Sequence, residues 1–530
     1  MKNSFLVINR SSKVRLFGLI LSILLPAITG RCADPTIDWH QGAGPLGSFS
    51  TPQSAPLDWS VVQDRNIRWR LKLPETGQST PIVSQGRVYF TTYASVDKDS
   101  SLAKDVVAWC CSARTGRVLW QRNIEGKHPL RLSGCFGDSS SPPAVCADGR
   151  VVFINASGRI VCFDIKGHEL WARNVLSVGR TLPFEMDGIF VFTRQQYPPN
   201  PDGTFPHKYA DLPQDQWTQL QAVDMQTGKD VWNSTCGVNM GNAVLPQTLN
   251  NGRQVAVVGR GGGHGPPEKP EGISLVDLTD GTTLWTLPLP GFMSTMSYRI
   301  RNNEVHIFHK GDHLSINAIT GEVLRRVSIV GDIPLRKWDG DRYRSTVGTL
   351  NASKKNRMIT QTSNLLVGEY HYFRCYIRPW MGRVHVTNGT IEYLELPLQI
   401  KTVKTATSEL LWYQPPMADK SGALNQQSFT PNSMTNSSGF VVSGDKRSRG
   451  NGWGHIASPL PSVAGEYLYV PVMNGTVYVL RWNSDKLDEH AVAGINDLGT
   501  VGESWTRASL SFADGRIYAH TIKELICIEQ

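Results

Sequence analysis

The densest group of residues that could do chemistry lies near the end of the chain, where cations, an acid, an aromatic residue and a histidine fall close together. They are Asp445, Lys446, Arg447, Arg449, Trp453 and His455. A guanidinium grips a carboxylate through two parallel hydrogen bonds, and an indole offers a flat face to a planar ligand. The pattern therefore predicts a site for a small anionic ligand. The same residues also fit a solvated charged run that ends an insertion, and the sequence leaves both interpretations open.

A second candidate is the glycine-rich stretch from Gly259 to Pro267, which contains Arg260 and His264. It lacks the Lys-Ser/Thr pair and the following helix of a phosphate-binding loop. We interpret it as a hairpin tip, from which Arg260 and His264 could line the mouth of a ligand-binding site. The sequence contains no Cys-x-x-Cys-His haem attachment and no recognisable Ser-His-Asp or zinc pattern, and we predict no metal site.

The elements that must position these residues follow from a recurring phrase: a β run, an Asp-like residue, a turn ending in Gly, and a large residue four positions later. Its instances, given as the glycine and the large residue, are Gly116 and Trp120, Gly167 and Trp171, Gly228 and Trp232, Gly281 and Trp285, Gly321 and Arg325, and Gly389 and Tyr393. The Asp or Asn can bond the backbone of its own turn, and Gly takes the φ > 0 position. The phrase predicts a β-hairpin whose tryptophan is buried between neighbouring repeats.

A second phrase precedes the hairpin and consists of Ser/Thr-x-Pro, a short turn and an aromatic-rich strand, as in the run from Ser79 to Phe90. The two phrases together supply four strands, A to D, which form one blade of a β-propeller. We predict an all-β fold, an eight-bladed β-propeller of four-stranded antiparallel blades. The blades are expected at about 78–126, 136–178, 179–238, 241–290, 292–332, 340–400, 453–500, and 503–530 completed by 58–73.

The two ends of the chain predict how the ring closes. From Asp514 to Glu529 the sequence supplies strands A to C of a blade and stops where strand D should begin. The N-terminal strand at 66–73 carries the expected tryptophan, Trp69. Pairing these two ends completes the last blade and hides both sheet edges.

The long insertions indicate which face of the propeller carries function. They are Ala94 to Lys104, Gln195 to Gln216, Arg260 to Glu271, and about 402–452 after strand D of blade 6. The A–B and C–D turns are short. Because the B–C and D–A connections of an up-and-down blade leave at one face, we expect the binding residues on that single face.

The run from Ala222 to Trp232, Ala-Val-Asp-Met-Gln-Thr-Gly-Lys-Asp-Val-Trp, resembles the repeat of pyrroloquinoline-quinone (PQQ) propellers. That superfamily contains quinoprotein alcohol dehydrogenases and also the non-enzymatic propeller lipoprotein of outer-membrane assembly, so the resemblance implies a fold and leaves the chemistry open. Stretches at 444–453, 493–499 and 523–528 are similar to those of the exported PQQ-like repeat proteins common in planctomycetes and their relatives, which mostly lack an assigned activity.

The resemblance also implies what a dehydrogenase would need. Its quinone, a planar tricarboxylate, would lie over the central channel, and the cations around Trp453 would suit it. A recognisable set of Glu, Asn and Asp ligands for the accompanying calcium is missing from the sequence. No cofactor is evident, and PQQ with calcium is expected only if the protein is a dehydrogenase.

The cysteines are interpreted by their register. Some PQQ alcohol dehydrogenases carry a vicinal disulfide beside the cofactor, and Cys110 and Cys111 are adjacent. However, Cys110 lies two residues before the turn, as Cys162 and Cys527 do, which indicates a small buried residue. Pairing among Cys135, Cys146, Cys236 and Cys375 stays open, because spacing does not fix connectivity.

The N-terminus is predicted to be an export signal, with a basic, acid-free start and an apolar run from Leu16 to Leu25. This run is too short to span a bilayer, so no transmembrane anchor is expected after cleavage. We expect a signal peptide at 1–33 and a single propeller domain at 34–530. Cleavage lowers the formal net charge from +9 to +4. No basic block interleaved with aromatic residues remains, which argues against a nucleic-acid partner.

The sequence thus favours a periplasmic or extracellular scaffold, expected to be monomeric, that binds a protein, a polysaccharide or a small anionic ligand on one face without catalysis. The alternative is a PQQ-dependent alcohol or sugar dehydrogenase. Whether the protein is an enzyme, and what its ligand is, stay open at this point.

Overall fold

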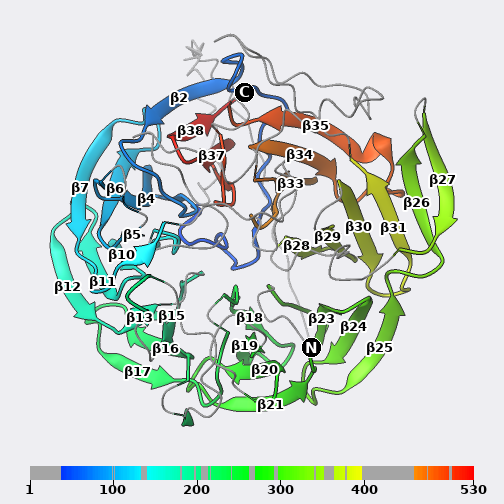
Figure 1. The fold of residues 1–530 in the computed structure, drawn as a ribbon, viewed down its shortest axis with the longest axis horizontal. Helices are drawn as coiled ribbons and strands as arrows, with labels where there is room; N and C mark the ends of the chain where they lie inside the picture. Colours follow the sequence, from blue (N-terminus) through cyan, green and yellow to red (C-terminus); the bar gives the residue numbers. More distant parts are fainter. Residues whose placement is uncertain are drawn as a thin grey trace, which may run out of the picture. The chain divides into compact units, whose positions relative to one another are not determined.

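The computed structural model describes the chain from residue 38 to its end, with gaps. The described residues are 38–97, 100, 102–132, 140–178, 182–195, 199–203, 213–214, 217–239, 241–261, 269–291, 297–339, 342–350, 363–375, 379–396, 459–473, 475–499 and 504–530. Eight antiparallel sheets stand around a common centre (Figure 1), which confirms the predicted eight-bladed propeller. No helix in this described part has the length and apolar character needed to cross a bilayer.

Blades 1 to 4 each run in the order A, B, C, D from the centre outward. Their strands are β3 (Ile82–Ser84), β4 (Arg87–Tyr93), β6 (Val106–Ser112) and β7 (Val118–Ile124); β9 (Val145–Ala147), β10 (Arg150–Asn155), β11 (Arg159–Asp164) and β12 (Glu169–Asn174); β14 (Phe184–Met186), β15 (Ile189–Gln195), β16 (Gln219–Asp224) and β17 (Asp230–Asn233); and β18 (Gln247–Thr248), β19 (Gln254–Arg260), β20 (Gly272–Asp277) and β21 (Thr283–Pro288). Three short strands lie in the connections: β5 (Leu102–Ala103) pairs with β8 (Leu130–Arg131), and β13 (Ser177–Val178) pairs with β15.

Blades 5 to 8 repeat this order. Their strands are β22 (Arg299–Arg301), β23 (Glu304–His309), β24 (Asp312–Asn317) and β25 (Val323–Ser328); β28 (Asn364–Val367), β29 (Tyr370–Arg374), β30 (Trp380–His385) and β31 (Ile391–Glu395); β32 (Ser462–Ala464), β33 (Tyr467–Pro471), β34 (Thr476–Arg481) and β35 (Val492–Asp497); and β36 (Ser511–Ala513), β37 (Arg516–His520), β38 (Glu524–Ile528) and β2 (Ile67–Lys72). A 3-10 helix, η4 (Glu489–Ala491), precedes β35.

The recurring tryptophan docks each blade on the next. Trp120, on strand D of blade 1, packs on Gly167 in the C–D turn of blade 2, and its indole donates a hydrogen bond to the Ile165 carbonyl at 3.0 Å. Gly167 has φ +84°, and a Cβ there would lie 2.9 Å from the indole. Only glycine therefore satisfies both the turn and the contact.

The same packing of a tryptophan on a turn glycine occurs at four further interfaces between neighbouring blades. It joins Trp69 to Gly116, Trp171 to Gly228, Trp232 to Gly281, and Trp285 to Gly321. The prediction of burial is confirmed for Trp120 and Trp232, each 8% exposed. Trp171 and Trp285 are partly buried, and each still packs on the turn glycine of the next blade.

The small residue of strand C lies directly opposite this tryptophan. Cys110 pairs with Trp120, Cys162 with Trp171, and Cys527 with Trp69. A register shift follows at once, between Cys110 and Cys111 in blade 1. The predicted register is confirmed, and blade 4 has the larger Leu275 at the same position, opposite Trp285.

Ring closure is also as predicted. Strand β2 pairs antiparallel with β38, and Trp69 lies opposite Cys527. The last blade therefore takes its outermost strand from the N-terminal part of the chain, and the C-terminal strand has no free edge. Figure 1 shows β2 outside β38 at the point where the two ends of the ring meet.

A segment that the sequence analysis did not predict crosses the centre of the ring. We call residues 38–51 the cap; they end in β1 (Ser50–Thr51), which pairs in parallel with β32. Backbone carbonyls of Trp39, His40 and Phe49 accept hydrogen bonds from the innermost strands of blades 1, 2 and 7. The Gln41 side chain binds the backbone of blade 3, and the Gly47 carbonyl accepts from Arg299 of blade 5.

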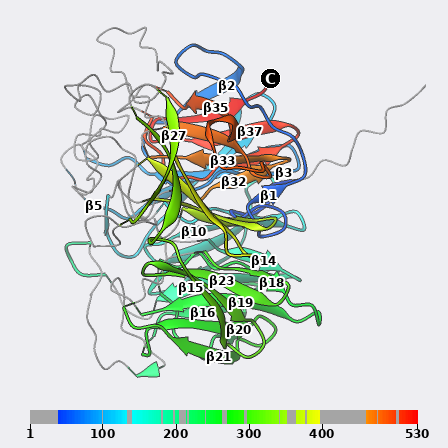
Figure 2. The same cartoon turned by 90° about the vertical axis from the view of Figure 1, so that its right-hand side faces the viewer.

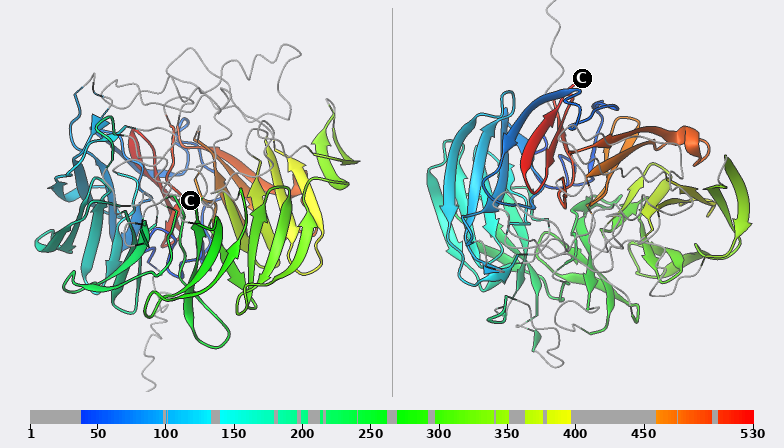
Figure 3. Two further views of the ribbon diagram at one scale, coloured as in Figure 1. Left: turned by 60° about the horizontal axis from the view of Figure 1, so that its bottom comes forward. Right: turned by 45° about the horizontal axis from the view of Figure 1, so that its top comes forward.

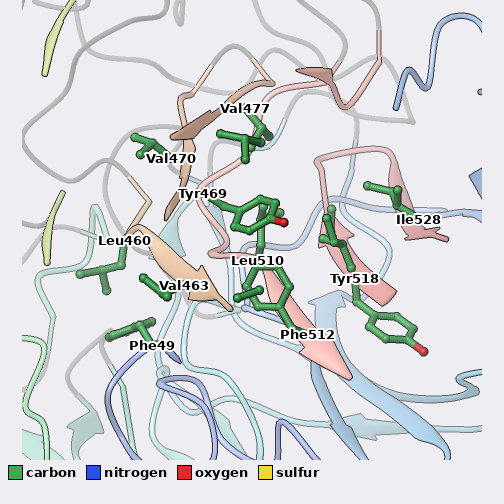
Figure 4. Packing of buried hydrophobic residues seen from close by; sticks show 14 of the residues in the cluster. Phe49, Leu460, Val463, Tyr469, Val470, Val477, Leu510, Phe512, Tyr518 and Ile528 are labelled. Carbon is green, nitrogen blue, oxygen red and sulfur yellow. The ribbon is translucent and has the colours of Figure 1, made fainter. Parts of the chain in front are cut away.

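The cap defines two unequal faces. We call the face with the A–B and C–D turns the turn face, and the face with the B–C and D–A connections the variable face. The cap residues bind the A strands near their A–B ends, and Figure 2 shows β1 toward one face and the connection strand β5 toward the other. In Figure 4, Phe49 of the cap lies beside Leu460 and Val463 of blade 7, in a core that continues to Phe512 of blade 8.

A hairpin between blades 5 and 6 was also not predicted. Strands β26 (Ile333–Trp338) and β27 (Tyr343–Gly348) add to blade 6, with β26 parallel to the outermost strand β31. The hairpin, in yellow-green, stands at the outer edge of the ring (Figure 3). Arg336 of β26 binds Glu489 of η4 at 2.8 Å, which ties the hairpin to blade 7.

We expect a chain that lacks residues 34–74 to aggregate and to lose its cooperative melting, because the deletion removes β2 and the cap and exposes β38 as an edge. Size-exclusion chromatography and thermal melting by circular dichroism measure both effects. A chain in which a short Gly-Ser linker replaces residues 402–452 is the control and should melt like the wild type. A monomeric 34–74 deletion with unchanged melting would refute the closure.

Candidate functional site

The predicted cluster of Lys446, Arg447, Arg449, Trp453 and His455 lies outside the described residues, as does His264. The described chain stops at Leu396 after strand D of blade 6 and resumes at Pro459 before strand A of blade 7. The insertion thus belongs to a D–A connection, as predicted. Whether its cations hold a ligand stays a prediction.

Hydroxyl and amide groups line the beginnings of the A strands on the variable face. The Gln78 backbone N–H donates to Ser140 Oγ at 3.2 Å, and Ser141 Oγ donates to Gln78 Oε1 at 3.1 Å. Thr91 Oγ1 donates to the Ser140 carbonyl at 2.8 Å. The Ser/Thr-x-Pro phrases of blades 1 and 2 are therefore joined by neutral hydrogen bonds, and charge at this face must come from other positions.

One such position lies at the end of strand B. The first residue of the C–D turn pairs with a residue of strand B, and the position lies five residues after that partner. In blades 1 to 5 it is occupied by Thr92, Asn155, Arg194, Arg260 and His309. Asn155 Nδ2 donates to the Lys104 and Ile124 carbonyls at 2.7 and 2.9 Å. Asn155 therefore fastens loops of the variable face, and blades 3 and 4 place cations at the equivalent position.

Arg260 does not line the mouth as an exposed cation, and this prediction was wrong. It is 5% exposed and donates to Ser274 Oγ at 3.3 Å, to Thr286 Oγ1 at 3.1 Å and to the Lys269 carbonyl at 3.0 Å. The guanidinium also lies over the ring of Trp217, at 5.9 Å from its centroid. Its role is to hold the B–C connection of blade 4 against strands C and D.

A cavity of about 420 Å³ opens at the variable face of blade 1. Its lining includes Glu75, Tyr93, Trp109 and Gln121. The Trp109 indole is stacked on Phe90 at 5.5 Å. Because Tyr93 and Trp109 are buried, at 1% and 4% exposed, the cavity offers polar groups more than an open aromatic face. Glu75 is the one carboxylate among its lining residues.

A second cavity, of about 470 Å³, lies between blades 2 and 3 on the same face. Lys127, His128, Arg173 and Arg194 contribute to its lining, against a single acid, Asp230. This is the cationic site that the structure adds to the sequence analysis. Sequence reasoning missed it because the four basic residues come from three separate segments and belong to no motif.

A family model of PQQ-type repeats, described as outer membrane protein assembly factor BamB, matches residues 62–181, which span β2 and blades 1 and 2. In this part the β-propeller resembles PQQ-type repeats. No curated protein matches it by sequence.

Two solved structures share the ring of this PQQ-like propeller. A europium-containing methanol dehydrogenase is 10% identical, with a TM-score of 0.52, and the match covers 91% of this chain and 88% of the other. The quinohemoprotein alcohol dehydrogenase from Comamonas testosteroni is 12% identical, with a TM-score of 0.50, over 93% of this chain and 80% of the other. At these identities the likeness establishes the fold alone.

The described side chains do not fit the metal of a quinoprotein. No three His, Cys, Asp or Glu side chains among them converge as a metal site. Two buried carboxylates already have strong partners: Asp277 accepts from Arg253 Nε at 2.5 Å, and Asp497 accepts from Ser60 Oγ at 2.5 Å. A calcium ion needs six to eight oxygen ligands, and the described part of the chain contributes no cluster of three carboxylates to such a set.

Cys110 and Cys111 are free thiols, which confirms that they form no vicinal disulfide. Burial raises the pKa of both thiols to about 12. Cys146, Cys236 and Cys375 are also buried, whereas Cys135 lies outside the described residues. These thiols are therefore unreactive core residues in this structure.

Three buried histidines, which the sequence analysis also missed, form a row between blades 5 and 6. His313 Nε2 lies 3.1 Å from His371 Nδ1, and Ser315 Oγ lies 3.2 Å from His306 Nδ1. Burial, with the charge of Arg325 nearby, lowers the pKa of His306 to about 4. Burial and His306 lower the pKa of His313 to about 3, and the pKa of His371 lies well below its usual value. The row is therefore neutral near pH 7 and serves packing.

We expect the PQQ-like propeller to lose stability as the pH falls from about 6.5 toward 4. In this window the histidines bind protons in the unfolded chain but not in the folded one, which costs about 1.4 kcal/mol per pH unit for each histidine. The replacement His313→Leu should make the slope shallower by about that amount. Urea unfolding between pH 4.5 and 7.5 measures it, and parallel curves for variant and wild type would contradict the assignment.

Proposed function

We propose that this PQQ-like propeller is an exported, non-catalytic scaffold that binds an anionic ligand, free or carried by a polysaccharide or a protein, on its variable face. The observation that carries the proposal is that the turn face and the variable face differ in structure. The cap crosses the centre at the turn face, whereas the two cavities described above open at the variable face. Both cavities described above therefore offer room for a ligand on the variable face.

The charge of that face supports an anionic ligand. Basic residues outnumber acidic ones four to one in the cavity between blades 2 and 3. The predicted cluster of Lys446, Arg447 and Arg449, which lies outside the described residues, belongs by its place in the sequence to the segment between β31 and β32. Opposite charges steer a ligand toward such a surface over distances of about the Debye length, roughly 10 Å at 0.1 M salt.

Export and a monomeric state belong to the same proposal. The predicted signal at residues 1–33 supports export to the periplasm or beyond. Closure of the ring within one chain supports a monomer, because β2 and β38 pair with each other and not with a second copy.

A PQQ-dependent alcohol or sugar dehydrogenase is the second candidate, favoured by the ring that this chain shares with two such enzymes. The cations of the variable face would suit the carboxylates of the quinone. The carboxylates of the described chain do not supply the metal ligands, so this candidate would depend on residues outside the described ranges.

Binding of the mature chain, residues 34–530, to an acidic and a neutral polysaccharide tests the proposal. Polygalacturonate and dextran are suitable probes, measured by isothermal titration calorimetry at two salt concentrations. We expect polygalacturonate to bind and its affinity to fall with salt, because exposed charges are screened. The double replacement of Arg447→Ala and Arg449→Ala should weaken binding without lowering the melting temperature, since exposed charges contribute little to folding.

The matched control is the double replacement of Arg117→Ala and Lys166→Ala, which removes the same charge from the turn face. It should leave binding unchanged. Absence of anion binding, or equal loss in both variants, would contradict the proposal. Stoichiometric PQQ uptake with Ca²⁺ and dye-linked oxidation of an alcohol or sugar would overturn the non-catalytic assignment.

A further inference from the structure

The cavity between blades 2 and 3 is lined by the D–A connections after blades 1 and 2, by the ends of β12 and β15, and by Asp230 at the start of β17. Lys127 and His128 come from the D–A connection after blade 1, Arg173 and Asn174 from the end of β12, and Arg194 from the end of β15. Val175 and Leu176 add apolar wall. The volume of about 470 Å³ lies within the roughly 300–1,000 Å³ typical of small-molecule sites.

The one acid of this cavity is already neutralised. Asp230 Oδ1 accepts from Arg173 Nη2 at 2.6 Å and from Gln221 Nε2 at 2.8 Å. Arg173 also donates to the Gly228 carbonyl at 2.7 Å, in the C–D turn of blade 3, so it serves the docking of the two blades. Lys127 and Arg194 form no ion pair with Asp230, although its carboxylate lies near enough to act on the charge of Arg194.

Arg194 is the exception at its register position. The equivalent Asn155 and Arg260 fasten loops through hydrogen bonds, as described above. Arg194, by contrast, makes no side-chain hydrogen bond to the described part of the chain, although its Nε is shielded from water. Burial and the neighbouring charge of Arg173 lower its pKa. A half-buried guanidinium without an acceptor is costly unless a ligand supplies one.

We propose that this cavity binds a small organic anion of about monosaccharide size, whose oxyanion group is held by the Arg194 guanidinium, with Lys127 and His128 as further cationic contacts. The proposal rests on the proposed function, because it names one subsite and one ligand class of the variable face. A carboxylate, a sulfate ester and a phosphate ester share the chemistry that a guanidinium recognises. The polar body of the ligand would contact Asn174.

Titration calorimetry on the mature chain, with glucuronate, glucose 6-sulfate and glucose 6-phosphate as probes, tests this site and separates the three oxyanions. Glucose is the neutral probe, and inorganic sulfate shows whether the sugar body adds affinity. We expect at least one sugar anion to bind and glucose not to bind. Arg194→Gln should weaken that binding about 10- to 100-fold, the value of a charge-assisted hydrogen bond.

Two further variants make the result interpretable. Arg194→Lys keeps the charge but loses the fork, and should retain part of the affinity. Arg117→Gln removes a cation from the turn face by the same kind of change and should have no effect. Unchanged melting of each variant shows that the ring is intact.

The outcomes separate this inference from the proposed function. If a sugar anion binds the wild type and Arg194→Gln equally, the anion lies elsewhere on the variable face and only the inference is overturned. If polygalacturonate binds but no sugar anion does, the cavity is likewise not the subsite. If neither polymer nor sugar anion binds, the proposed function fails.

Discussion

The packing of a strand-D tryptophan on the turn glycine of the next blade is the contact on which the ring depends. In blade 1 the indole of Trp120 fills the space that a side chain at position 167 would take, and its N–H binds a carbonyl of the neighbouring blade. The contact fixes the angle between two sheets that share no backbone ladder. Closure extends it to the last blade, because Trp69 comes from the N-terminal strand yet docks on Gly116 like the others.

Because this contact recurs, the two faces are distinguished by the positions that depart from the repeat. Strand B ends in a loop-fastening side chain in blades 2 and 4, but in blade 3 the same position holds Arg194 beside an open cavity. The cap is another departure, since it belongs to no blade and yet binds the innermost strands of several. Together these departures make one face of a near-symmetric ring chemically different from the other.

The repeat made much of the fold predictable from the sequence alone. Gly167 and Trp171 recur at fixed offsets, and the register of Cys110, Cys162 and Cys527 followed from the distance to the turn. These are local relations within one hairpin, so a single sequence suffices to find them. Closure of the ring could be predicted because the last blade lacks its strand D, whereas the N-terminal strand at 66–73 precedes the first complete blade.

The cap, the β26–β27 hairpin and the histidine row could not be predicted, for one shared reason. Trp39, Arg336 and His371 each gain their structure from partners that are remote in the chain or belong to another blade, and no periodic pattern marks such partners. The cationic cavity could not be predicted for the same reason, because Lys127, Arg173 and Arg194 come together only after blades 2 and 3 have docked. Sequence reasoning instead selected the dense local run around Arg447, which lies outside the described residues.

Hydrogen–deuterium exchange of the mature chain, with and without a saturating sugar anion, tests most directly whether ligands are held by the variable face. The account predicts slower exchange in peptides that cover 125–132, 173–178 and 190–195, and unchanged exchange in the C–D turns at 112–117, 164–168 and 224–229. Protection of those turns, with no change at the D–A connections, would place the ligand on the turn face and contradict the account.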